Sequence, residues 1–173
     1  MRPRGNTQTR GNPLSNYIGQ ALQRKESSRL LTGKGRYVGD LSLPGTIEAA
    51  VLRSAHAHGR IVKIDTAKAL QLPGVIAVYT ADDIGDLPGF PTTFVPRPEL
   101  SQTFQRPLAR RKVRYVGEPL AFVVAVDRYT AEDALEHIEV EIDPLDVIVD
   151  ARLAVENSAP LLHEAINSNV AHR

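Results

Sequence analysis

The feature that most constrains the fold is an apolar run over residues 120–126, preceded by Pro119 and followed by Asp127. It reads Leu-Ala-Phe-Val-Val-Ala-Val, which is far shorter than the roughly 18–20 apolar residues of a membrane span. A short, continuous and β-branched run of this kind is typical of a buried strand. It therefore predicts the central strand of a sheet.

A helix is expected directly after this strand, over residues 127–138. Thr130 and Asp133 stand at the spacing of a capping box, which favours a helix start. The apolar residues recur at helical spacing and would form one stripe facing the sheet. They are Ala131, Ala134, Leu135 and Ile138.

The hydrophobic period then changes to two, which predicts a strand with one face in water. Its acids are Glu139, Glu141 and Asp143, and they alternate with Ile138, Val140 and Ile142. An earlier stretch repeats the strand, helix, strand order, with strands over 60–65 and 75–80 around a helix over 66–72 that Asp65 or Thr66 could cap. The strand over 75–80 has the pattern of one buried on both faces.

A further strand is expected over 46–53, and units of the strand, helix, strand type usually cross over right-handed. We therefore expect the fold class to be α+β, with a small mixed β-sheet and covering helices. The predicted organisation is a flexible N-terminal arm over 1–20, a domain over 21–155 and an extended C-terminal tail over 156–173. Within the domain, 85–107 holds five prolines and predicts a long interfacial loop, 145–149 a last short strand, and 151–155 a helical turn.

Composition excludes several classes of function. The 173 residues suffice for one ordinary domain, and the chain has no cysteine, so disulfides, thiolate iron–sulfur or zinc sites and a cysteine nucleophile are excluded. The formal net charge of +1 argues against a nucleic-acid binder. Without an apolar span or signal region, we expect a soluble, cytoplasmic protein.

Few residues are candidates for chemistry. His56 and His58 would share a face on a strand, as two metal ligands must, but no third ligand lies at short spacing, so we expect no metal site. Glu118 could be a buried general base or a turn carboxylate held by nearby arginines, the second being favoured. Ser54 lacks the elbow motif of a nucleophile. Gly33-Lys34-Gly35 has the composition of a phosphate loop without its spacing and predicts a glycine-rich turn.

Positive charge gathers just before the central strand. This patch is expected to be solvated or to face a partner, and it lacks the interleaved aromatics of a single-strand nucleic-acid site. Its members are Arg106, Arg110, Arg111, Lys112 and Arg114.

Several short motifs occur in the order of a known domain. They are Arg-Leu-Leu-Thr-Gly-Lys-Gly-Arg-Tyr-Val-Gly-Asp (29–40), Leu-Pro-Gly (43–45), Leu-Arg-Ser (52–54), His-Ala-His (56–58), Arg-Ile (60–61), Pro-Gly-Val (73–75), Val-Arg-Tyr-Val-Gly-Glu-Pro (113–119), Ala-Glu-Asp-Ala (131–134) and Asn-Val-Ala (169–171). Together they resemble the a/b hammerhead domain that opens the large, molybdopterin-binding subunit of the xanthine dehydrogenase, aldehyde oxidase and carbon monoxide dehydrogenase family. The opening motif is most similar to the carbon monoxide dehydrogenase branch. Two departures, Ala55 in place of a common proline and Ile-Asp-Pro-Leu over 142–145, weaken only the assignment to a branch.

The resemblance implies a part of an enzyme that does not turn over alone. In that family, the residues that hold the molybdenum cofactor and the catalytic glutamate lie in domains after the hammerhead, beyond the end of this chain. We therefore expect no catalytic, cofactor-binding or metal-binding residue here. Molybdopterin with molybdenum, iron–sulfur clusters and FAD are expected on partner chains of a hetero-oligomer. The family's reaction is hydroxylation of a carbon centre, or oxidation of a small molecule, with oxygen taken from water.

The expected function is that of a non-catalytic structural subunit or domain packed against a molybdopterin-binding catalytic chain. The alternative is a stand-alone protein-interaction module without enzymatic activity. Three origins of this chain stay open: a naturally split subunit, a truncated domain and a repurposed relic. A split subunit would be expected to bury more than about 2,000 Å² in its interface with the catalytic chain. Besides the 85–107 loop and both tails, the candidate interface residues are Arg53, His56, His58, Tyr115, Gly117, Glu118 and Pro119.

Overall fold

The computed structural model describes residue 19 and residues 21–41, 43–91 and 103–170. The chain divides into two units, residues 1–44 and residues 45–173. Apart from Gly19, the N-terminal arm expected over 1–20 lies outside the described residues, and so does the middle of the 85–107 loop.

Unit 1 contains a short helix, α1 (Ser27–Leu31), that ends in a Schellman motif. The backbone N of Gly33 donates to the carbonyl of Leu30 (3.2 Å), and the backbone N of Lys34 donates to the carbonyl of Arg29 (2.8 Å). The motif needs a residue in the left-handed region, and Gly33 provides it with φ +69°. The Gly-Lys-Gly sequence is therefore a helix-ending turn, as expected.

A 3-10 helix, η2 (Val38–Asp40), follows in unit 1. The Asp40 side chain accepts a hydrogen bond from the backbone N of Tyr37 (2.9 Å), which closes the turn. Neither α1 nor η2 contains a buried residue, so this unit is organised by backbone and capping bonds.

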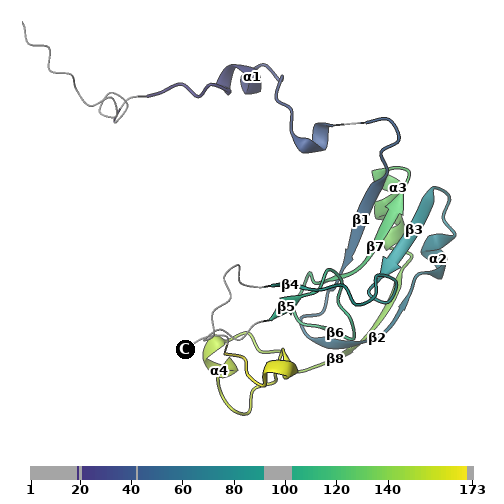
Figure 1. Ribbon diagram of the computed structural model, residues 1–173, viewed down its shortest axis with the longest axis vertical. Helices are drawn as coiled ribbons and strands as arrows, with labels where there is room; N and C mark the ends of the chain where they lie inside the picture. Colours follow the sequence, from purple (N-terminus) through teal and green to yellow (C-terminus); the bar gives the residue numbers. More distant parts are fainter. Residues whose placement is uncertain (1–18, 20, 42, 92–102, 171–173) are drawn as a thin grey trace, which may run out of the picture. The chain divides into compact units, whose positions relative to one another are not determined.

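In unit 2, the first sheet has the strand order β1 (Glu48–Arg53), β7 (Pro119–Ala125), β3 (Val75–Thr80). The expected central strand is confirmed, because β7 pairs with β1 and with β3 (Figure 1). The expectation that β3 is buried on both faces is wrong. It is an edge strand of this sheet with Ile76 and Tyr79 exposed, since the sheet has a helix layer on one face only.

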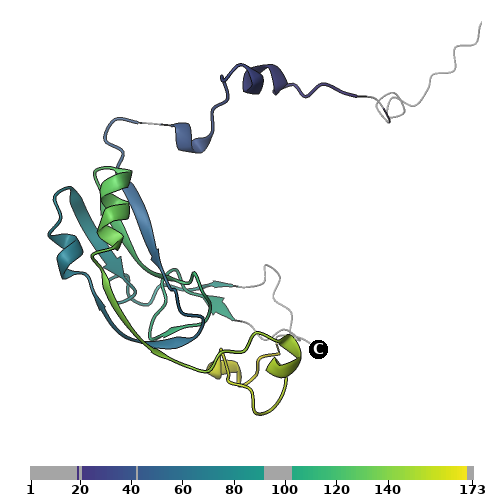
Figure 2. The ribbon, with the colours of Figure 1, turned by 180° about the vertical axis from the view of Figure 1, so that it is seen from behind.

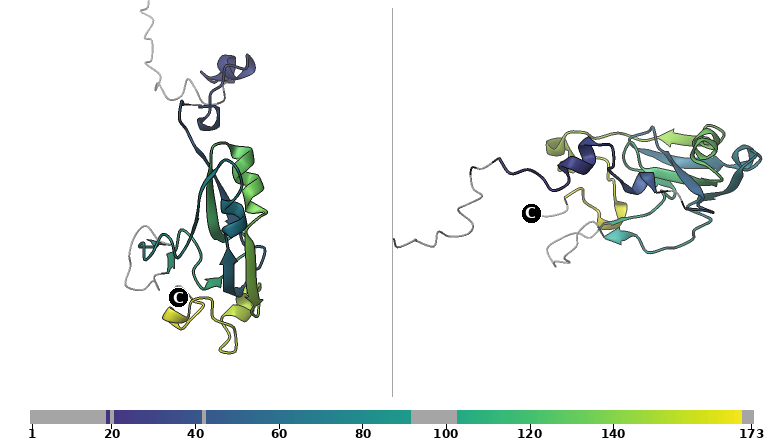
Figure 3. Two further views of the ribbon diagram at one scale, coloured as in Figure 1. Left: turned by 90° about the vertical axis from the view of Figure 1, so that its right-hand side faces the viewer. Right: turned by 90° about the horizontal axis from the view of Figure 1, so that it is seen from above.

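The helix α3 (Arg128–Leu135) lies against this sheet, and Figure 3 (left) shows it on one side of the strands. Its apolar stripe is confirmed, with Ala131 and Ala134 fully buried. The cap differs from the expectation: Asp127 accepts from the backbone N of Thr130 (2.9 Å), because Asp127 precedes the first turn and can reach its free N–H groups. The shorter α2 (Ala67–Leu70) is capped by the preceding aspartate.

The second sheet has the order β6 (Lys112–Val113), β2 (Gly59–Asp65), β8 (Glu139–Pro144), and its ladders are antiparallel. The α+β class is confirmed, but the single mixed sheet with right-handed crossovers is wrong. Each expected strand, helix, strand segment begins in one sheet and ends in the other, so its two strands are not neighbours. The predicted alternation on β8 is correct: its glutamates are exposed while Val140 and Ile142 are partly buried.

Two clusters of buried side chains form the core of unit 2. The first, which includes Val123 and Ala134, lies between the first sheet and the helices. The second, which includes Val113 and Leu120, lies toward the second sheet. Three partly buried residues pack against both clusters and join them, namely Leu52, Ile64 and Val140.

The remaining elements lie near one end of unit 2 (Figure 2). Two short strands, β4 (Phe90–Pro91) and β5 (Phe104–Gln105), pair at the base of the proline-rich loop. The expected helical turn is α4 (Ala151–Ala154), and a 3-10 helix, η3 (Glu164–Ile166), lies beyond it. The strand expected over 145–149 is wrong, because these residues have no ladder partner in the described part of the chain. None of the described helices is long and apolar enough to cross a bilayer.

Candidate functional site

The residues 114–118 form a tight turn between β6 and β7. The backbone N of Glu118 donates to the carbonyl of Tyr115 (3.2 Å), and Gly117 permits the bend with φ +91°. The Glu118 carboxylate closes the turn by accepting from the backbone N of Arg114 (2.5 Å). A side chain and a left-handed glycine therefore fix the shape of this turn together.

The end of β1 is tied to the same turn by three hydrogen bonds. The backbone N of Ser54 donates to the carbonyl of Glu118 (2.9 Å), and its carbonyl accepts from the backbone N of Gly117 (2.8 Å). The Arg53 guanidinium donates to the carbonyl of Gly117 (2.9 Å). The Ser54 hydroxyl binds both the carbonyl and the backbone N of His56 (2.9 and 3.0 Å), so it is engaged locally.

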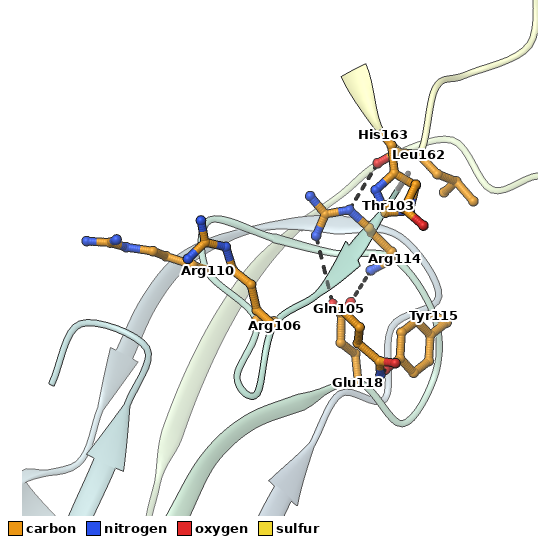
Figure 4. Close-up of a pocket in the computed structure, with 10 residues that line it drawn as sticks. Thr103, Gln105, Arg106, Arg110, Arg114, Tyr115, Glu118, Leu162 and His163 are labelled. Carbon is orange, nitrogen blue, oxygen red and sulfur yellow. Dashed lines mark hydrogen bonds and ion pairs between the residues drawn. The ribbon is translucent and has the colours of Figure 1, made fainter. Parts of the chain in front are cut away.

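A cavity of about 310 Å³ opens beside the turn (Figure 4). Glu118 lies in its wall and is only 6% exposed, with the Arg114 guanidinium 3.8 Å from its carboxylate. On the same wall, the amide of Gln105 donates to the Tyr115 hydroxyl (2.5 Å). The cavity thus joins the turn, the strand β5 and the C-terminal segment, of which Leu162 and His163 are lining residues.

Burial raises the pKa of Glu118, while the backbone N–H and the charge of Arg114 oppose that rise. The pKa of His163 is lowered, first by burial and then by the charges of Arg114 and Lys112. The cations of the cavity have partners: Arg110 pairs with Asp86 (2.6 Å) and Arg114 donates to the carbonyl of Leu162 (3.0 Å). The geometry agrees with the preferred interpretation of Glu118 as a turn carboxylate held by arginine, because the carboxylate binds the backbone N of Arg114 and lies 3.8 Å from its guanidinium.

The structure brings most of the predicted interface residues together. Arg53, Gly117, Glu118 and the start of β7 at Pro119 share the bonds just described, and Tyr115 lies in the cavity wall. The two histidines are placed differently from each other. His56 is exposed and joins the group through Ser54.

His58 is 5% exposed and points elsewhere, with Nδ1 bonded to the carbonyl of Asp146 (2.7 Å). It does not share a face with His56, because residues 54–58 lie between β1 and β2 and contain bends at 55, 57 and 58. In the described ranges, no three His, Asp or Glu side chains are placed to hold a metal ion.

Sequence reasoning missed the C-terminal segment as part of this site. Buried Lys112, expected to be solvated or partner-facing, donates to the carbonyl of Leu161 (3.1 Å) and pairs with Glu164 (2.5 Å). Its position beside Val113 on a short strand was the available signal, since a lysine in a buried strand requires a carboxylate partner. The segment expected as an extended tail is thereby bonded to β6.

A family model described as the aldehyde oxidase and xanthine dehydrogenase a/b hammerhead domain matches residues 32–146. The carbon monoxide dehydrogenase large chain of Afipia carboxidovorans is 44% identical over 172 residues, which cover 95% of this chain and 21% of that one. The nicotine 6-hydroxylase large subunit of Paenarthrobacter nicotinovorans is 39% identical over 143 residues, covering 82% and 17%.

Solved structures agree with these matches. Quinoline 2-oxidoreductase from Pseudomonas putida 86 superposes with a TM-score of 0.79 at 42% identity, covering 89% of this chain and 20% of that one. A Cu,Mo-CO dehydrogenase superposes with a TM-score of 0.74 at 44% identity, covering 89% and 19%. The chain therefore spans about a fifth of the length of the relatives it matches.

Proposed function

Because the chain belongs to the aldehyde oxidase and xanthine dehydrogenase a/b hammerhead domain family, we propose that it is a non-catalytic structural part of a molybdenum hydroxylase. In this role it packs against a molybdopterin-binding catalytic part and helps to shape the entrance to the active site. The proposed reaction of the assembly is hydroxylation or oxidation of a small molecule with oxygen from water. The names of the relatives, which include a carbon monoxide dehydrogenase and a nicotine hydroxylase, support this class of reaction.

The non-catalytic role is supported by the hydrogen bonds of the two polar side chains that could otherwise act in catalysis. The carboxylate of Glu118 holds the backbone N of Arg114, and the hydroxyl of Ser54 holds the backbone of His56. A nucleophile or general base must be within reach of a reacting group in a substrate pose. Here both groups are committed to the conformation of the chain.

The iron–sulfur clusters of the family do not fit this chain. Iron–sulfur clusters require thiolate ligands, and the sequence has no cysteine. The described residues bring no three His, Asp or Glu together as metal ligands. We place the iron–sulfur clusters on partner chains or domains for this reason, and we propose the same location for FAD and for molybdopterin with molybdenum.

The interface we propose is the face around the 114–118 turn. Its exposed side chains are Arg53, His56, Tyr115 and Val116, while Gly117, Glu118 and Pro119 set the backbone beneath them. Exposed aromatic and arginine side chains on a rigid support are the residue types that contribute most to interface affinity. His58, also predicted as an interface residue, is buried and is not among these exposed side chains, and its Nδ1 is bonded to the carbonyl of Asp146.

Affinity capture from the source organism, with this chain as bait, tests the proposal. We expect to recover a larger chain carrying molybdenum, together with iron–sulfur and flavin subunits, by intact mass and metal analysis. Recovery of this chain alone and free of metal would instead support a stand-alone interaction module. Nucleic acid as the captured partner is not expected, and the cytoplasmic location stays a prediction.

A further inference from the structure

Residues 21–41, the longest described stretch of unit 1, present large apolar side chains that no described residue of that unit buries. Leu31 and Val38 are each 85% exposed, and Tyr37 is 68% exposed. The Schellman motif after α1 and the Asp40 cap of η2 give the backbone a defined course. We call residues 21–41 the apolar segment.

Such a segment needs a contact outside itself to keep this conformation. An isolated helix shorter than about 12–15 residues is marginal in water, and α1 has five residues. Capping motifs add only modest stability to a helix that has no packing partner. Exposed Leu, Tyr and Val side chains on a defined backbone are therefore suited to insertion into a partner.

The relatives contain a counterpart of the apolar segment within a much longer chain. The superposition on quinoline 2-oxidoreductase covers 89% of this chain, which is more than unit 2 contains, so it extends into unit 1. The sequence match to the carbon monoxide dehydrogenase large chain covers 95% of this chain. In both relatives the counterpart of the apolar segment belongs to a chain about five times as long, most of which has no counterpart here.

The charges of the apolar segment indicate which residue types should surround its binding site on the partner. The apolar segment holds five exposed cations and two exposed carboxylates, so a groove with an acidic rim would complement it. The cations are Arg24, Lys25, Arg29, Lys34 and Arg36.

We propose that the apolar segment docks through Leu31, Tyr37 and Val38 into an apolar, acid-rimmed groove of the molybdopterin-binding part of a molybdenum hydroxylase. This inference rests on the proposed function and adds a second attachment, separate in the sequence from the 114–118 turn. The segment is a strap that fastens the hammerhead domain to the catalytic part.

The test uses the full 173-residue chain and a tagged probe. The probe is the molybdenum-binding chain that affinity capture recovers from the source organism, separated from this chain. We compare the unmodified chain, the pair Leu31→Ser with Val38→Ser, and the control pair Val62→Ser with Ile76→Ser, which removes exposed aliphatic side chains from unit 2. Circular dichroism and the unfolding midpoint verify that each variant is folded.

The unmodified chain and the control pair should bind the probe with similar Kd. The Leu31 and Val38 pair should bind about 100-fold more weakly, since two buried aliphatic side chains are lost. Equal Kd values for the two double variants would overturn the strap and leave the proposed function intact. An equal loss of affinity in both would also overturn the strap, because any exposed apolar surface would then contribute to binding. Failure of the unmodified chain to bind would count against the proposed function and the strap together. Sedimentation tests self-association. If the unmodified chain and the control pair were dimers and only the Leu31→Ser, Val38→Ser variant were a monomer, the segment would be assigned to self-association instead.

Discussion

At the scale of single residues, Glu118 shows how a buried carboxylate can serve conformation. It lies in a cavity wall with its pKa raised by burial, a combination that often marks a catalytic acid or base. Its partners argue for a structural role, since it accepts from the backbone N of Arg114 and faces the guanidinium of the same residue. Two neighbouring residues thus have linked roles: Glu118 closes the 114–118 turn, and Pro119 begins β7.

Replacing this carboxylate should change the pH dependence of stability. Burial raises the pKa of Glu118 above its ordinary 4.5, so the folded chain holds a proton that the unfolded chain has released. The contribution of Glu118 to stability therefore falls as pH rises from 4.5 through the folded pKa. In urea unfolding from pH 4 to pH 7, the unmodified chain should lose stability relative to Glu118→Gln as pH rises.

Exposed Glu136 on unit 2 provides the control for this measurement, because Glu136→Gln should keep the pH profile of the unmodified chain. Acids with lowered pKa, such as Asp83, lose stabilising interactions as pH falls and act equally in all three proteins. Parallel pH profiles of the unmodified chain and Glu118→Gln would refute the assignment.

A second residue-scale prediction concerns Gly117, which has φ +91° and open space where the methyl group of an alanine would lie. Gly117→Ala should lower the free energy of unfolding by about 1–2 kcal/mol, because an L side chain is disfavoured in the left-handed region. Chemical denaturation measures the change. Gly39→Ala, at a position with equally open space and no positive φ, should leave the unfolding of unit 2 unaltered.

At the scale of elements, the C-terminal segment is held by side chains that bond to its backbone. Lys112 and Arg114 on one side donate to the carbonyls of Leu161 and Leu162. Asn169 provides three more bonds: its amide nitrogen donates to the carbonyls of Ala154 and Pro160, and its oxygen accepts from the backbone N of Leu162. We call these bonds from side chains to backbone the polar staple of the segment.

Removing the asparagine should therefore loosen this segment selectively. Asn169→Ala deletes three bonds of 2.9–3.1 Å, each contributing about 0.5–1.5 kcal/mol. Hydrogen exchange of the Leu162 amide should become at least tenfold faster, while amides of β7 keep their rates. Exposed Asn157 gives the matched control, and unchanged exchange at Leu162 in Asn169→Ala would contradict the staple.

The sequence predicted elements better than their pairing. Periodicity identified β7, the stripe of α3 and the alternation on β8, because these signals are local. Membership of one sheet or another depends on contacts between residues far apart, so two antiparallel sheets were mistaken for one mixed sheet. The candidate turn was recognised from its motif. The position of Lys112 beside Val113 indicated a carboxylate partner, but the identity of that partner, Glu164 in the C-terminal segment, depends on a long-range bond that no local pattern encodes.

At the scale of the whole molecule, β7 joins the two core clusters of unit 2. Val123 belongs to the first cluster and Leu120 to the second, and Leu52 packs against both. Because the sheets share these residues, unit 2 should unfold as one cooperative body.

Leu120→Ala tests this shared core. Leu120 is almost fully buried, so its truncation should reduce the free energy of unfolding by about 2–5 kcal/mol. Tyrosine fluorescence and far-UV circular dichroism should report the same midpoint. Two separated transitions would show that the sheets fold independently. As the control, Leu70→Ala, at an exposed position, should lower the free energy of unfolding far less.

The most direct test of the central claim, that the 114–118 face is covered by a molybdenum-binding partner, is hydroxyl-radical footprinting of the captured complex against the free chain. Tyr115, 40% exposed at the turn, should lose most of its reactivity in the complex. Tyr129, 80% exposed on α3, should keep its reactivity and serves as the internal control. A complex in which Tyr115 reacts as in the free chain would contradict the account, because the proposed interface would then lie in solvent.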